Sequence, residues 1–506
     1  MTEKVWYDEC NIYFINKRVN HLDYRELFTC LAERYENRDF RIGRNHFSYA
    51  RATGYIAFFA LFVRLVMSVS YLNAYDTEWN IMWAVQLGEG FFSAHSHVND
   101  LDYPPLYLYP LYFVGRLIRN DSIGGYPPLR MLTIKFLPCL TDSLTCIVLY
   151  RLASKRNKPL GLLAAAFWAL NPAAIFNCAC WGQTDCVLMF MAALLMLALE
   201  ERHVTAAGIL WAAMCSTKLQ GLYLTPVVGM EVLTVCFGSL HPKEFSLSRI
   251  KKPAVMRLVR FVCAAAGTMA LIYLPFMIGS AVSDFSPELG FWEKFFKPVT
   301  VYSEGLAKYP YITLNADNFY MIFGLNGVKD NWQILPGVTV STLGSLYLLL
   351  AMALVVAVYL FGIRRSHWLA GFMFMQCVFM LTCRQHERYQ IVTLVLLAGA
   401  FVTVADRRLM KLLTFSSIVI FFNQFRVLSS VRESTNWWRY YKYHYGTAEW
   451  LERRNDYAAM NALVNVVLFG ASMIFVIRYF FDEKSDKPVV SRAREIFNQQ
   501  RSRIWK

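Results

Sequence analysis

The sequence predicts an all-α polytopic membrane protein with about 12 transmembrane helices, and two observations carry that prediction. Apolar runs of roughly 17–25 residues recur along the chain, and a helix of that length can cross the hydrocarbon core of a membrane. Charged residues make up 17% of the 506 residues, whereas a soluble domain carries about 25%. Lipid admits only helices or closed barrels, and these runs are too long for barrel strands.

The charge distribution predicts an orientation in the membrane. The net charge is +15, and the basic residues cluster in short segments between apolar runs, as they do in cytoplasmic loops. We therefore expect membrane lipids, and no nucleic acid, as partners. The 12 cysteines are scattered, many of them inside apolar runs, and the spacing of Cys178 and Cys180 is not that of a zinc or redox site. No metal site is expected.

The apolar runs divide the chain into four parts. A cytoplasmic N-terminal segment precedes a transmembrane module with two long outer loops that carry interfacial helices, and C-terminal transmembrane helices with an outer aromatic loop precede a basic cytoplasmic tail. Their bounds are 1–54, 55–405 with outer loops 73–130 and 281–335, 406–480, and 481–506. The apolar stretch 204–238 lies between two basic segments, so it must cross twice, which places Lys218 at the outer side.

This topology collects the reactive side chains on one side of the membrane. They are Asp76 and Glu78 after the first span, Asp102, the segment Trp181–Asp185, Lys218, and His386–Arg388. Carboxylates, a lysine, a histidine and an arginine beside lipid suit the transfer of a sugar from a lipid-linked phosphate. Asp76 would deprotonate an acceptor hydroxyl, and the cations would stabilise the departing phosphate without a metal.

Five short motifs, in order, resemble those of polytopic GT-C glycosyltransferases. Asp102-Tyr103-Pro104-Pro105-Leu106 resembles the D-Y-P-P-L of glucosyltransferases that use dolichyl-phosphate-glucose in N-glycan precursor assembly. The others are Tyr75-Asp76-Thr77-Glu78, Trp181-Gly182-Gln183-Thr184-Asp185, Thr217-Lys218-Leu219-Gln220 and His386-Glu387-Arg388-Tyr389. The Trp-Gly-Gln block and the His-Glu-Arg form, in place of His-Glu-Lys, look closer to prokaryotic relatives similar to the GPI mannosyltransferases. The resemblance covers residues 55–405.

The resemblance implies an inverting, metal-independent hexosyltransferase with Asp76 as catalytic base. The donor would be a polyprenyl-phosphate glucose or mannose, with its phosphate held by His386, Arg388 and Lys218. The residues expected to bind substrate are Glu78, Asp102, Tyr103, Trp181, Gln183, Asp185 and Tyr389. The acceptor would be a lipid-linked glycan or a cell-surface polymer on the extracytoplasmic or lumenal side. We expect a monomer in the bacterial plasma membrane, with the endoplasmic reticulum membrane as the alternative.

Simpler interpretations exist for each group. Asp76 and Glu78 could be acids in the first turn of an interfacial helix, and Asp102 could brace the Pro-Pro turn. Thr184 or Asp185 could cap a helix, Lys218 could extend to lipid headgroups, and His386–Arg388 could be an interfacial ion-pair cluster. Asp142, in the middle of the second predicted span, should face the protein interior with a partner.

Two other functions fit the composition. A polytopic transporter or flippase of lipid-linked sugars would place paired charges near the membrane midplane in two related halves, and neither is visible in the sequence. A protein O-glycosyltransferase usually carries an additional soluble domain, which is not apparent here.

Overall fold

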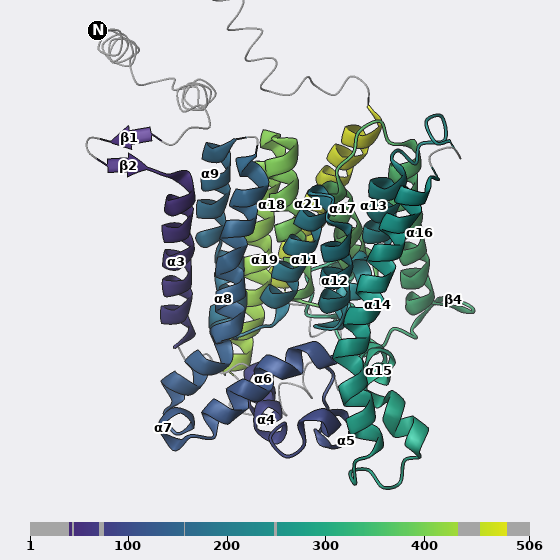
Figure 1. Cartoon of the computed structure of the whole chain (residues 1–506). Helices are drawn as coiled ribbons and strands as arrows, with labels where there is room; N and C mark the ends of the chain where they lie inside the picture. The colour runs from purple at the N-terminus through teal and green to yellow at the C-terminus, as the bar shows by residue number, and fades with distance from the viewer. Residues whose placement is uncertain are drawn as a thin grey trace, which may run out of the picture.

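The computed structural model describes residues 40–42, 45–69, 75–155, 157–246, 250–433 and 456–482 (Figure 1). Most of the predicted N-terminal segment 1–54, most of the outer aromatic segment 429–457 and nearly all of the tail 481–506 lie outside these residues. Within the described part, the chain is an all-α polytopic membrane protein, as the sequence predicts.

The helices of the membrane bundle run side by side (Figure 1). They are α3 (Tyr49–Ser68), α8 (Pro127–Ser154), α9 (Lys158–Ala169), α11 (Asp185–Glu200), α12 (Val204–Cys215), α13 (Thr225–Phe237), α14 (Lys252–Ala281), α16 (Val340–Phe361), α17 (His367–Leu381), α18 (Val392–Val404), α19 (Arg407–Glu433) and α21 (Asp456–Phe481). The stretch 204–238, for which two crossings were predicted, forms two helices, α12 and α13, joined through η4 (Leu219–Leu224), and of these only Leu219–Phe237 is long enough to cross a membrane.

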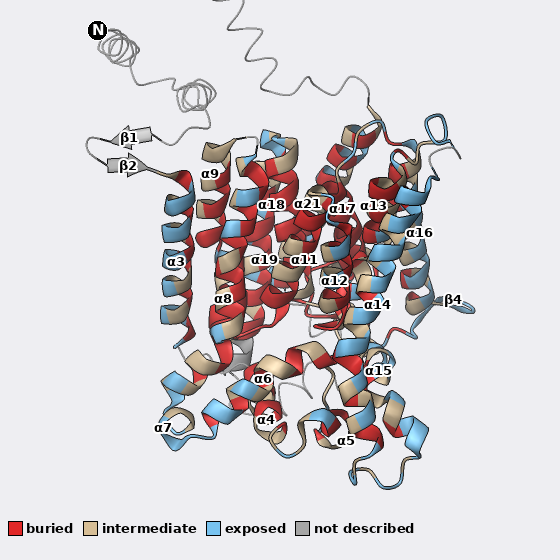
Figure 2. Ribbon diagram, in the orientation of Figure 1, coloured by how far each residue is buried: buried red, intermediate tan, exposed pale blue. Residues whose placement is uncertain are grey.

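The predicted number of about 12 transmembrane helices is too high by the criterion of length. Among the described residues, seven helices are long and apolar enough to cross a membrane, or eight if α9 and the segment Pro172–Trp181, bent by 45°, form one broken span. The difference arises from short apolar helices, including α12, α17 and α18. Figure 2 shows that α17 and α18 are mostly buried, whereas α3 and α16 on the periphery are extensively exposed. Protein therefore surrounds α17 and α18, so these two helices need not be as long as a helix that contacts lipid across the whole membrane.

Both long connections carry short helices at the same end of the bundle, which we call the site end (Figure 1). These are α4 (Tyr75–Gln86), η2 (Phe91–Ser93), α5 (Ala94–His97), α6 (Pro105–Ile118), α7 (Asp121–Gly124) and α15 (Phe291–Ala307). The two Pro-Pro pairs explain where helices begin, because α6 starts at Pro105 and α8 at Pro127. Proline is favoured in the first turn, where its missing N–H costs no hydrogen bond.

Short strands complete the described structure. Two antiparallel hairpins are formed by β1 (Phe40–Ile42) with β2 (Asn45–Phe47) and by β4 (Gln333–Leu335) with β5 (Val338–Thr339). A parallel pair joins β3 (Thr313–Leu314) to β6 (Gln385–His386). The remaining elements are α10 (Pro172–Ile175), η3 (Phe176–Trp181), η6 (Phe319–Phe323) and η7 (Tyr389–Ile391). The parallel pair ties the second long connection to the segment that carries His386.

The buried Asp142 has the interior partner that its position predicts. Its carboxylate lies 2.6 Å from the guanidinium of Arg64 on α3, and the indole N–H of Trp168 on α9 donates to it at 3.1 Å. Both charged side chains are completely buried. This ion pair joins three helices inside the bundle.

One group of cysteines lies beside the same carboxylate. Ligand-type atoms of Asp142, Cys178 and Cys186 lie within 4.8 Å of one another. The guanidinium of Arg64 already contacts Asp142 at 2.6 Å and would repel a metal cation held there. We therefore assign this cluster a structural role.

Candidate functional site

Asp76 lies at the centre of a polar cluster at the site end. It belongs to the first turn of α4, and its Oδ2 accepts hydrogen bonds from the indole N–H of Trp181 at 3.1 Å and from the amide of Gln183 at 2.6 Å. A guanidinium nitrogen of Arg388 lies 3.6 Å from the same oxygen. Three residues from two separate segments therefore converge on one carboxylate oxygen of Asp76.

The backbone before α11 is irregular and presents Trp181 and Gln183 to Asp76. The six residues of η3 form a π-helical turn, and Gly182 follows in the left-handed conformation, with a φ of 79°. Such turns often occur at functional sites, and glycine adopts this conformation at little cost. The hydroxyl of Thr77 donates to the Trp181 carbonyl at 2.8 Å, and the ammonium of Lys135 donates to the Cys180 carbonyl at 3.0 Å.

Arg388 bridges Asp76 and Glu387. Its guanidinium contacts the Glu387 carboxylate at 2.7 Å, a shorter distance than the 3.6 Å to Asp76. Its Nε is buried and has no hydrogen-bond partner among the described residues. Burial raises the pKa of Glu387, and the positive charge of Arg388 opposes that rise. Glu387 therefore holds Arg388 firmly, Asp76 interacts with it weakly, and its Nε–H remains available as a hydrogen-bond donor.

Lys218 forms a second buried pair beside the first cluster. Its ammonium donates to Asp185 at 2.7 Å, and the other Asp185 oxygen is buried without a partner among the described residues. The rings of Tyr103 and Tyr389 lie 5.9 and 5.7 Å from the ammonium, within the range of cation–π attraction. The two clusters are adjacent because the segments 181–185 and 386–389 contribute to both.

Two further bonds join these segments to the start of α6. The Tyr103 hydroxyl lies 2.6 Å from that of Thr184, and the Leu106 N–H donates to the carbonyl of Ser216 at 3.0 Å. The motif Asp102–Leu106 therefore contacts both the Trp181–Asp185 segment and the segment that carries Lys218.

His386 lies in β6, opposite Leu314 of β3. Its ring stands 5.2 Å from that of Tyr309 and 5.0 Å from that of Tyr389. Burial, and next the positive charges of Arg388 and Lys218, lower the pKa of His386 well below its ordinary value of 6.5. A neutral His386 can offer a phosphate a hydrogen bond but not a charge.

We expect acid to destabilise the protein partly through His386. The unfolded chain protonates this histidine near its ordinary pKa of 6.5, whereas the folded chain resists protonation to a lower pH. Its contribution to stability is therefore complete above about pH 6.5 and is lost as the pH falls below that value. His386→Gln should flatten the fall in melting temperature of the detergent-solubilised protein between about pH 6.5 and 5. His203→Gln, at an exposed position, is the control, and an unchanged slope in His386→Gln would contradict this expectation.

In the described part of the chain, two of the expected site residues form no ion pair with Arg388 or Lys218. Asp102 pairs with Lys308, which follows α15, at 3.1 Å, so it braces two connections rather than contacting Asp76. Glu78 is two residues beyond Asp76 on α4, and side chains at that spacing leave a helix in different directions.

The structure shows which of the simpler interpretations hold for Asp76, Thr184 and Lys218. Asp76 does occupy a helical first turn, as one of them proposed, yet it also contacts Trp181, Gln183 and Arg388. Thr184 precedes α11 but makes no capping hydrogen bond with its side chain. Lys218 is buried against Asp185 rather than extended to the surface.

Some contributing residues were not singled out in the sequence. Glu387 stands inside the His-Glu-Arg-Tyr motif, and its position directly before Arg388 was the available signal. Lys135 lies within a predicted span, where an ionisable residue usually has a buried partner. Thr77 and Thr184 lie inside two of the quoted motifs, but the sequence indicated only a possible helix cap for Thr184 and no separate role for Thr77.

The comparison with known families bears on part of this site. A sequence model of the family described as GPI transamidase subunit PIG-U matches residues 92–304. No curated protein matches the chain. The matched region covers less than half of the chain and includes the Trp181–Asp185 segment and Lys218, but neither Asp76 nor Arg388. The chain is thus similar to a GPI-related membrane subunit from the later part of its first long connection to the early part of its second.

Proposed function

We propose that the protein is an inverting membrane glycosyltransferase that moves a hexose from a polyprenyl-phosphate sugar to a hydroxyl acceptor. One observation carries the proposal: the acid, the arginine, the lysine and the aromatic residues of five separate motifs meet at one end of the bundle. A cluster of this kind, at the end of a membrane bundle, is accessible to a lipid-linked substrate and to a polar acceptor.

The geometry of Asp76 supports a role as general base. Its contacts from Trp181, Gln183 and Arg388 all go to Oδ2, and the side chain is 33% exposed. Among the described residues, no side chain donates a hydrogen bond to Oδ1, so this oxygen can accept one from an acceptor hydroxyl. A base that is oriented through one oxygen and open at the other meets the positional requirement for proton abstraction.

The unequal contacts of Arg388 support a role in binding the donor phosphate. Glu387 holds the guanidinium at 2.7 Å, whereas Asp76 lies at 3.6 Å, beyond hydrogen-bonding distance. A phosphate could replace Asp76 at this guanidinium, because Glu387 would keep Arg388 in position. The donor sugar would then lie between Arg388 and Asp76, which an inverting displacement requires.

The proposed step is balanced without a further reactant. The acceptor oxygen forms a bond to the anomeric carbon while its proton passes to Asp76. The bond between that carbon and the phosphate oxygen breaks, and the phosphate leaves with the electron pair. Arg388 and Lys218 are the cations that would stabilise its charge.

The family match favours a second candidate, a non-catalytic subunit that holds a lipid-linked glycan for a partner enzyme. The matched family is described as a subunit of a transamidase, and the match excludes Asp76 and Arg388. This candidate replaces the expected monomer with a complex and favours the endoplasmic reticulum membrane over the bacterial plasma membrane.

One experiment separates the enzyme from a subunit or a transporter. Purified protein is incubated with polyprenyl-phosphate glucose or mannose and lipid-linked acceptors, and released polyprenyl phosphate is measured by mass spectrometry. The glycosyltransferase predicts release together with a product heavier by one hexose. Retention of the donor without release would favour the subunit, and movement of intact donor across a vesicle membrane would favour the transporter.

A further inference from the structure

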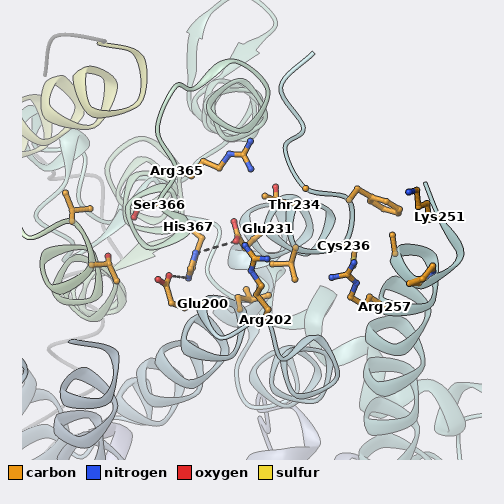
Figure 3. Close-up of a pocket in the computed structure, with 18 of the residues that line it drawn as sticks. Glu200, Arg202, Glu231, Thr234, Cys236, Lys251, Arg257, Arg365, Ser366 and His367 are labelled. Atoms are coloured by element: carbon orange, nitrogen blue, oxygen red, sulfur yellow. Dashed lines mark ion pairs between the residues drawn. The ribbon is translucent and has the colours of Figure 1, made fainter. Parts of the chain in front are cut away.

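A polar cavity of about 680 Å³ (Figure 3) lies at the opposite end of the bundle from Asp76. The helix α11 shows the separation, because it carries Asp185 at its first residue and Glu200, in the cavity wall, at its last. Sixteen residues of α-helix span about 24 Å. The volume lies within the usual range for a ligand site, about 300–1,000 Å³.

Four cations line this cavity from different elements. Arg202 follows α11, Lys251 immediately precedes α14, Arg257 lies in the second turn of α14, and Arg365 precedes α17. Figure 3 shows these four side chains among those that line the cavity. Among the described residues, no carboxylate lies within 4.0 Å of Arg202, Lys251 or Arg257, whereas Arg365 approaches Glu244 at 3.8 Å. Three cations are therefore available to an anion.

The backbone conformation of Arg202 is unusual for an arginine, which supports a functional role for its side chain in the cavity. Arg202 has a φ of 60°, in the left-handed region, at the end of α11, where glycine or asparagine is the favoured residue. The left-handed conformation is energetically less favourable for an arginine than for a glycine or an asparagine. The side chain it supplies faces the cavity.

Two carboxylates form the other side of the cavity. His367 lies between Glu200, at 3.6 Å, and Glu231, at 3.7 Å (Figure 3). His367 is buried, whereas Arg202 and Lys251 are exposed, so the histidine lies deeper in the cavity than these two cations. Carboxylates accept hydrogen bonds from hydroxyl groups and repel phosphate, which divides the cavity into a phosphate end and a hydroxyl end.

We propose that this cavity binds a phosphate group that carries a polyhydroxyl substituent, with Arg202 and Arg257 on the phosphate and the Glu200–His367–Glu231 group on the hydroxyls. A lipid headgroup is the source that the position favours. The cavity opens at the end of the bundle that the positive-inside rule assigns to the cytoplasm, and basic pockets between membrane helices bind the headgroups of anionic lipids. A free glycerol phosphate has the same recognition chemistry.

The test measures both sources with the full-length protein. In one arm, protein is released from phosphatidylcholine nanodiscs that contain phosphatidylglycerol, and the bound phosphatidylglycerol is measured by native mass spectrometry. In the other arm, glycerol phosphate is titrated into detergent-solubilised protein by calorimetry. The variants are Arg202→Asn, which keeps a residue that tolerates left-handed backbone, and Arg257→Gln. Arg260→Gln is the matched control, because Arg260 is exposed on the same helix but does not line the cavity.

We expect each single variant to lose about fivefold in affinity and the double variant about 25-fold, because a basic residue near the membrane surface contributes about that factor. This loss should appear in the nanodisc arm if a lipid is the ligand, and in the calorimetric arm if the ligand is soluble. Wild-type affinity of the double variant in both arms would overturn the proposal. An equal loss in Arg260→Gln would also overturn it, because the attraction would then be a general property of the basic surface.

Discussion

Asp76→Asn is expected to reduce hexosyl transfer by about a thousandfold while leaving the protein folded. Asparagine retains an oxygen that can accept the hydrogen bonds of Trp181 and Gln183, but it cannot take a proton from an acceptor hydroxyl. The position is partly exposed, so the loss of the 3.6 Å contact with Arg388 should cost little stability. The measurement is the initial rate of polyprenyl phosphate release at saturating donor.

Glu78→Gln is the matched control for this prediction. It removes the same charge from the same first turn of α4, so it changes the local electrostatics without removing the proposed base. We expect its rate to stay within a few-fold of the wild type. Full activity of Asp76→Asn would eliminate Asp76 as the base, and an equal loss in both variants would point to a general effect of charge on α4.

Arg64→Met is expected to give the largest loss of stability, about 3–5 kcal/mol, because it leaves a buried carboxylate without its counter-ion. The guanidinium contacts Asp142 at 2.6 Å and donates to the carbonyls of Ala60 and Ala169 at 3.1 and 2.9 Å. Its removal therefore strands Asp142 and leaves carbonyls of α3 and α9 with one partner fewer. The expected result is a lower melting temperature in detergent and a smaller yield of monodisperse protein.

Two further variants test this explanation. Arg151→Met breaks a pair with Glu201 in which the arginine side chain is 61% exposed, and such pairs contribute about 0–1 kcal/mol. Arg64→Met combined with Asp142→Leu removes both charges and should recover much of the lost stability. A double variant as unstable as Arg64→Met would show that the loss comes from packing rather than from the unpaired carboxylate.

The positions of the helices and their ends were largely predictable from local features. Long apolar runs mark α8, α14, α16 and α21, and paired prolines mark the starts of α6 and α8. The number of membrane-spanning helices was overestimated because the hydrophobicity of an apolar run does not show whether its helix contacts lipid or other helices. The short helices α17 and α18 are enclosed by other helices, and this enclosure is a property of the assembled bundle.

The candidate site was predictable as a set of residue types but not as a set of contacts. The motifs supplied Asp76, Lys218 and Arg388, and basic segments between spans predicted that they share one side. Asp102 was assigned to the same site, yet its partner is Lys308 from the second long connection. No local pattern relates two residues so far apart in the chain, because their distance depends on how the connections fold over the end of the bundle.

By itself, the sequence determined that the chain forms a helical membrane protein, where most helices begin and end, and which polar residues are available for chemistry. Helix length, hydrophobicity and proline position are local quantities, so they can be inferred directly from the amino-acid sequence. Only the tertiary structure decided that Arg64 neutralises Asp142, that Trp181 and Gln183 orient Asp76, and that Arg388 lies between Asp76 and Glu387. Those contacts join separate helices and loops, and packing in three dimensions is what brings such elements within hydrogen-bonding and ion-pairing distance.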